Sequence, residues 1–229
     1  MADALSALKT LERDLRDIFG ARLQSLVHYG AREHKTATLH GHEHHGHHER
    51  VLLHTLAVTE TLTADDLRAC AKRISSWHDE DLATPLIMPR AEVERSLDVF
   101  PFELSAIIAD HVVLFGANPF ERLRVEQSDL RWACEVQARG HLLHLREGYV
   151  ETRGRDDALA VLVVRSAPAW KSLLENMARL ENTVAEQDEV TKLVGVKEIS
   201  NEEAVRIFPA YLQAVERLTQ QVDRWSAAK

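Results

Sequence analysis

Histidine is the residue type in this sequence with the most evident chemistry. Thirteen of the 229 residues are His, and six of the thirteen fall within nine consecutive positions. Neutral imidazole is a good ligand for Zn²⁺, Ni²⁺, Cu²⁺ and Co²⁺, and the glycines at 41 and 46 leave the segment free to turn several nitrogens toward one ion. The segment 34–48 is therefore predicted to bind a transition metal, Zn²⁺ or Ni²⁺. The predicted metal-ligating residues are His40, His42, His44, His45, His47, His48 and His54.

Two other interpretations of this segment remain open. It is a solvated insertion whose His content has no selected role, or it is a pH-sensing loop, because His titrates close to neutral pH. A structural metal site of fixed geometry is not favoured, because a flexible repeat specifies no single coordination.

Composition and charge narrow the classes of function. Lys and Arg total 28 and Asp and Glu total 36, which gives a formal charge of −8 with neutral His. A generally acidic surface makes nucleic acid an unlikely partner. The sequence has neither a visible signal peptide nor an apolar run of the roughly 20 residues that a membrane span needs. With two isolated Cys residues, Cys70 and Cys134, it is typical of a cytoplasmic protein that does not act at a membrane.

The first half of the chain alternates helical and strand patterns. Leu8, Leu11, Leu15 and Ile18 recur at helical spacing, which predicts a helix up to Phe19. Thr63 and Asp66 have the spacing of a capping box that starts a second helix, whose apolar face runs to Trp77. Short helices are expected at 91–97 and 102–109. The predicted strands are Leu23–Tyr29, Val51–Val58, Pro85–Met88 and Val112–Phe115.

The second half is helical in pattern. Helices are expected from a cap at Ser128 to about Glu151, over 156–180 with a break or kink at Pro168, and over 201–225. The last helix carries an apolar seam that packs within a bundle or, alternatively, forms a homodimer. We expect an α+β chain with an α/β domain at 1–120 and a helical bundle at 121–229. The seam residues are Phe208, Tyr211, Val215, Leu218, Val222 and Trp225.

The order of the expected elements resembles the nucleotidyltransferase superfold of kanamycin nucleotidyltransferase and the minimal bacterial nucleotidyltransferases. This order is a helix, a strand ending in Gly30, a loop, an apolar strand, a helix and a third strand. Residues 97–116 and 131–149 resemble segments of bacterial nucleotidyltransferase domain-containing proteins. The resemblance covers most of residues 5–165. In that family a Gly-Ser turn holds nucleotide phosphates, and an Asp-x-Asp pair with a third carboxylate holds two Mg²⁺ ions. The later segment matches at Cys134, Glu135, Arg139, Leu142, Leu145, Arg146 and Tyr149.

This sequence departs from the family pattern at its catalytic positions. Ala31 replaces the Ser after Gly30, and the Asp-x-Asp positions fall near Leu52 and His54. The third-strand region, Leu86 to Met88, has no carboxylate. Because Mg²⁺ prefers hard oxygen ligands and His is a poor substitute, bound Mg²⁺ is not expected.

Three functions follow from this resemblance and these departures. The leading hypothesis is a nucleotide-binding or regulatory module without catalytic carboxylates, using Gly30, Ala31, Arg139 and Arg146. One alternative is an active nucleotidyltransferase with a non-standard metal site in which His54 is the best catalytic candidate. The other is a Zn²⁺- or Ni²⁺-binding protein that uses the His-rich loop.

Overall fold

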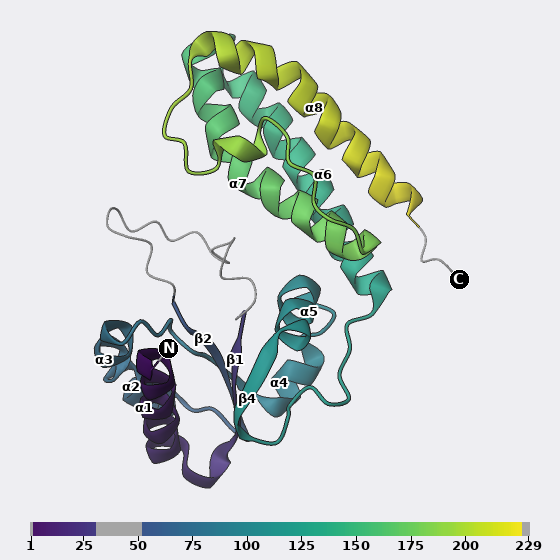
Figure 1. The fold of residues 1–229 in the computed structure, drawn as a ribbon. Helices are drawn as coiled ribbons and strands as arrows, with labels where there is room; N and C mark the ends of the chain where they lie inside the picture. Colours follow the sequence, from purple (N-terminus) through teal and green to yellow (C-terminus); the bar gives the residue numbers. More distant parts are fainter. Residues whose placement is uncertain (1, 31–51, 226–229) are drawn as a thin grey trace. The chain divides into compact units, whose positions relative to one another are not determined.

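The chain forms two compact units, residues 1–125 and 126–229. The structure is a computed structural model, and it describes residues 2–30 and 52–225 (Figure 1). Ala31 and the six histidines from His40 to His48 lie outside the described residues. The first unit holds a mixed sheet with helices and the second is all helical, so the predicted α+β class is confirmed. Across the described residues, no helix has both the length and the apolar character that crossing a membrane requires.

The first unit is built on a four-stranded sheet in the order β3-β2-β1-β4. Strand β1 (Leu23–Tyr29) pairs antiparallel with β2 (His54–Thr59) on one side and with β4 (His111–Gly116) on the other. Strand β3 (Leu86–Pro89) runs parallel to β2 and forms an edge, as the proline beside the predicted third strand suggests.

Alternate residues of β1 enter two different apolar clusters. Leu26 packs with residues of α1, α2 and α3, whereas Val27 packs with residues of α4 and α5. Successive side chains of a strand point to opposite faces, so the sheet is covered on both sides, as Figure 1 shows. The helices are α1 (Ala2–Phe19), α2 (Ala64–Ala71), α3 (Ile74–Asp79), α4 (Arg90–Arg95) and α5 (Pro101–Ala109).

Charged side chains hold the start of α2 in place on the face of the sheet that α1 covers. The Thr63 hydroxyl accepts from the Asp66 amide, and the Asp66 carboxylate accepts from the Thr63 amide, so the predicted capping box is present. Arg22, in the short 3₁₀ helix η1 (Gly20–Arg22), donates two hydrogen bonds of 2.7 Å to the Asp66 carboxylate. The Arg22 guanidinium, and then the Thr63 hydroxyl, hold the pKa of Asp66 well below its usual range.

The end of β4 lies very close to the start of β1. Gly116 has φ +76°, and a Cβ atom there would come within 1.9 Å of the Gln24 carbonyl oxygen. The Ser25 hydroxyl donates to the Ala117 carbonyl at the same place. This end of the sheet is closed by backbone contact and accepts only glycine at position 116.

The second unit packs three long helices, α6 (Gln127–Glu151), α7 (Asp156–Glu181) and α8 (Asn201–Arg224), together with a short 3₁₀ helix η2 (Thr191–Leu193). The seam residues from Phe208 to Val222 are buried within this unit, at 7% exposed or less, whereas Trp225 lies after the end of α8 and is half-buried. These residues therefore serve intramolecular bundle packing.

Several boundaries differ by one to three residues from those expected from the sequence, and one expected helix is divided in two. Strand β2 begins at His54, and Val51 lies outside the described residues. The helix predicted from the capping box to Trp77 is broken into α2 and α3 at Lys72 and Arg73. Glu126, not Ser128, is the N-cap of α6.

Candidate functional site

Strand register brings three ring-bearing side chains together at the end of the sheet where β1 finishes. Tyr29 is paired with His54 of β2 and with His111 of β4. Residues directly opposite each other in a sheet share a face, so the three side chains form a row across three strands. The rings of Tyr29 and His54 are 5.8 Å apart between centroids, and all three residues are half-buried. Burial raises the pKa of the Tyr29 hydroxyl.

Gly30 follows this row directly. It has φ +72°, and its amide donates a 3.0 Å hydrogen bond to the Asp110 carbonyl. Among residues 2–30 and 52–225, apart from its chain neighbours, no atom lies within 4 Å of the position that a Cβ would take. Gly30 and Gly116 therefore share a positive φ but differ in their surroundings. A Cβ at Gly116 would clash with the Gln24 carbonyl, whereas the described residues leave the space beside Gly30 open. An open backbone turn at a strand end is the kind of place where a ligand can approach the main chain.

His111 is held by several polar contacts. Its Nδ1 lies 3.0 Å from the Ile108 carbonyl and 3.1 Å from that of Ile107, and its Nε2 lies 3.2 Å from Oδ1 of Asn118. The ring also packs edge-to-face on Phe120 at 5.0 Å. Both ring nitrogens of His111 are therefore engaged at this end of the sheet.

The residues at this edge do not fit a two-magnesium site. Leu52 and His54, near which the Asp-x-Asp pair was expected from the resemblance, are not carboxylates, and β3 consists of Leu, Ile, Met and Pro. Among residues 2–30 and 52–225, no three His, Cys, Asp or Glu side chains come together in a way that could hold a metal ion. Mg²⁺ requires several oxygen ligands at short distance, so no Mg²⁺-dependent step can be assigned to these residues.

The two arginines predicted to bind nucleotide lie in the helical unit. Arg139 donates to Glu135 at 3.1 Å and to Asp223 at 2.8 Å, and Arg146 donates to Glu216 at 2.7 Å. Both side chains thus connect α6 to α8 through ion pairs. A phosphate at either position would have to compete with these carboxylates.

The helical unit contains a polar cluster that sequence reasoning did not identify. Nε2 of His141 lies 2.6 Å from the hydroxyl of Tyr211, and the His141 ring stacks on Trp170 with centroids 6.0 Å apart. The Trp170 indole in turn donates to Asp188 at 2.7 Å. Burial, and then the neighbouring His144, lowers the pKa of His141 to about 4. Burial raises the pKa of Tyr211, so both partners are neutral at pH 7.

A sequence signal for this cluster was present. Cys134, Ala138 and Leu145 are buried at 0%, 0% and 2% exposed. His141 continues their 4-3-4 spacing and therefore lies on the buried face of α6.

No protein-family model and no curated protein matches the chain. Among solved structures, the chain is similar to that of spectinomycin adenyltransferase AAD(9) from Enterococcus faecialis, crystallised with ATP and spectinomycin. The TM-score is 0.43 and the sequence identity 10%, over 91% of this chain and 99% of that one. Similarity at this level assigns neither a family nor an activity.

Proposed function

We propose that the first unit is a nucleotidyltransferase-like module that binds a nucleotide, in a binding or regulatory role, without two-metal chemistry. The observation that carries this proposal is the open turn at Gly30, next to the half-buried rings of Tyr29 and His54. The Gly30 amide itself donates to the Asp110 carbonyl, so this turn would offer a phosphate open space against the main chain, and a half-buried aromatic ring can support a base.

The donor set at this edge supports binding over catalysis. Nucleotidyl transfer places negative charge on phosphoryl oxygens, and the family neutralises it with Mg²⁺ held by carboxylates. The sequence resemblance puts the corresponding positions near Leu52 and His54, neither of which is a carboxylate. Binding against an open main-chain turn with ring stacking needs no such carboxylates.

Titration calorimetry of the full chain with ATP, GTP and CTP, with and without Mg²⁺, tests this proposal. Gly30→Asn is the informative variant, because Asn tolerates positive φ while its side chain fills the open space. Gly154→Asn is the matched control, since Gly154 has φ +74° and equally open surroundings in the other unit.

We expect Gly30→Asn to weaken nucleotide binding by about tenfold or more, a loss of about 1.4 kcal/mol, and Gly154→Asn to leave it unchanged. Labelled nucleotide should not be transferred in Mg²⁺. Absence of binding at millimolar nucleotide, or an equal effect of the two variants, would refute the proposal.

A transition-metal function is the second candidate, and strand pairing favours it. Residues 31–51 connect Gly30 to Leu52, and the adjacent strands place Tyr29 opposite His54. The residues on either side of the segment 31–51, which contains the six histidines, therefore lie close to His54. A metal at this edge would need donors from that sequence, because the described residues supply no complete set.

Calorimetry with Zn²⁺ and Ni²⁺ distinguishes two forms of this candidate. If His54 is a ligand, His54→Ala and a variant lacking residues 40–48 should each weaken metal binding. Equal binding by the wild type and by the variant lacking 40–48 would exclude the His-rich sequence. If the metal supports nucleotidyl transfer, labelled nucleotide should be transferred with Mn²⁺, Zn²⁺ or Co²⁺, and His54→Ala should abolish the transfer.

A further inference from the structure

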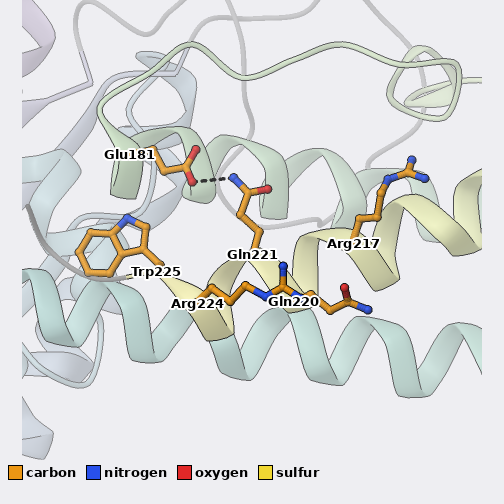
Figure 2. Close-up of a pocket in the computed structure, with 6 residues that line it drawn as sticks. All are labelled: Glu181, Arg217, Gln220, Gln221, Arg224 and Trp225. Carbon is orange, nitrogen blue, oxygen red and sulfur yellow. Dashed lines mark hydrogen bonds between the residues drawn. The ribbon is translucent and has the colours of Figure 1, made fainter.

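The helical unit has a hollow of its own at the C-terminal ends of α7 and α8. It has a volume of about 430 Å³, within the roughly 300–1,000 Å³ typical of small-molecule pockets. Figure 2 shows Glu181 projecting from α7 and the other lining side chains from α8 and the residue after it. The lining residues are Glu181, Arg217, Gln220, Gln221, Arg224 and Trp225.

Two of these side chains are cations without a carboxylate partner among the described residues. Arg217 and Arg224 are exposed and seven positions apart, so they lie on the same face of α8 at about 10.5 Å along its axis. Some other exposed arginines of this unit are paired, such as Arg139 with Asp223 and Arg206 with Glu189. Arg153 and Arg165 also have no carboxylate partner among the described residues, but they do not line the hollow. Guanidinium groups left unpaired beside a hollow are suited to bind phosphate oxygens.

The remaining lining groups complement an anion that carries a ring. Trp225 is half-buried directly after the last residue of α8, and it lines the hollow together with Arg224. The only carboxylate in the lining, Glu181, accepts a 2.6 Å hydrogen bond from Gln221 and keeps further oxygen lone pairs for a ligand hydroxyl or amine. Two guanidiniums, two amides, one carboxylate and an indole surround the same space.

We propose that this hollow binds a small phosphorylated molecule with a flat ring, of which a mononucleotide is the simplest common form. The phosphates contact Arg217 and Arg224, and the ring stacks on Trp225. This site belongs to the second unit alone and does not depend on the function proposed for Gly30.

The test uses the full chain and two probes, ADP and inorganic pyrophosphate, in titration calorimetry. The variant Arg217→Gln/Arg224→Gln removes both charges and keeps good helix formers. Arg153→Gln/Arg165→Gln is the control, because it removes two exposed charges from the same unit away from the hollow. Circular dichroism checks that each variant is folded.

We expect the Arg217→Gln/Arg224→Gln variant to lose about tenfold or more in affinity for both probes, and the control to bind both as the wild type does. Trp225→Ala should weaken ADP binding but not pyrophosphate binding, and Trp225→Phe should restore ADP binding. Equal binding by the two double variants, or no pyrophosphate binding at millimolar concentration, would overturn the proposal.

The Gly30→Asn variant separates this site from the one at the sheet. If both sites exist, ADP binding to the wild type has two components, and each variant removes a different one. If Gly30→Asn removes all ADP binding, this proposal fails. If the arginine double variant removes all of it, the sheet-end proposal fails.

Discussion

A histidine and a tyrosine lie side by side in each unit, in opposite settings. Tyr29 and His54 are half-buried on neighbouring strands, with ring centroids 5.8 Å apart, next to the open turn at Gly30. His141 and Tyr211 join α6 to α8 through a 2.6 Å contact, and Tyr211 is only 2% exposed.

The two pairs differ in how deeply they are built into the interior of their units. The His141 cluster continues through Trp170 to Asp188, so its polar groups are engaged inside the protein. A satisfied buried network stabilises one arrangement of helices and leaves no group for a ligand. The pair at the sheet end contributes less to packing and adjoins open space. Stability should therefore depend on the helical pair and binding on the sheet pair.

The largest expected effect on stability comes from replacing Trp170. Its ring stacks on His141 and belongs to the same cluster as Tyr211 and Asp188. Trp170 is 2% exposed, and Trp170→Ala removes both its packing and its hydrogen bond to Asp188. We expect a loss of about 3–5 kcal/mol in the free energy of unfolding of the helical unit. Urea denaturation followed by circular dichroism measures it. Trp132→Ala is the control, since Trp132 is 61% exposed and its loss should cost little. Similar losses in the two variants would contradict this assignment.

The sequence predicted the elements better than the contacts between them. Strand β1 was predicted at its observed bounds, because an apolar run between Gly20 and Gly30 leaves little choice. Strand β2 was predicted to start at Val51 but starts at His54, because its partner β1 ends at Tyr29, opposite His54. Pairing register, which the composition of one strand cannot reveal, decides where a strand begins.

The split between α2 and α3 has a tertiary cause. Leu67 and Trp77 fit one helical face by spacing, but Leu67 is 50% exposed and Trp77 only 1%. Arg73 donates to the buried carboxylate of Asp14 at 3.0 Å, and the Trp77 indole donates to it at 3.1 Å. These long-range contacts position α3 independently of α2. The row of Tyr29, His54 and His111 was missed for a similar reason, because strand pairing alone brings it together.

The second-largest effect should be a pH dependence of the helical unit. The pKa of His141 is lowered from 6.5 to about 4 in the folded protein, chiefly by burial. Between these values the unfolded chain binds a proton that the folded chain does not, so stability falls as the pH is lowered. We expect about 3 kcal/mol to be lost between pH 7 and pH 4. The lowered pKa of Asp66 acts only below its ordinary value of 3.8, outside this window.

Urea denaturation at a series of pH values checks this dependence. His141→Gln should remove most of the slope between pH 4 and pH 6.5. His78→Gln is the control, because His78 is exposed and lies in the other unit. An unchanged slope in His141→Gln would show that burial of this imidazole does not control the acid response.

A smaller effect is expected from the tyrosine hydroxyl of the helical pair. Tyr211→Phe keeps the ring but leaves Nε2 of His141 without its 2.6 Å partner. A half-buried polar atom that loses its hydrogen bond costs about 1–2 kcal/mol, which the midpoint of urea denaturation should show. The pKa of His141, followed by NMR, should also change in this variant. If neither the stability nor the pKa changes, the contact contributes nothing to the helical interior.

The smallest effect on stability should come from the sheet pair, and it tests the comparison most directly. No hydrogen bond of the Tyr29 hydroxyl is found within the described residues, so Tyr29→Phe should change the free energy of unfolding by less than about 0.5 kcal/mol. His54→Ala removes the neighbouring ring and should change nucleotide or metal binding more than it changes stability. The reverse order, a large loss of stability with unchanged binding, would mean that Tyr29 and His54 pack the end of the sheet as His141 and Tyr211 pack the helical unit. The proposed function would then have to be sought away from this edge.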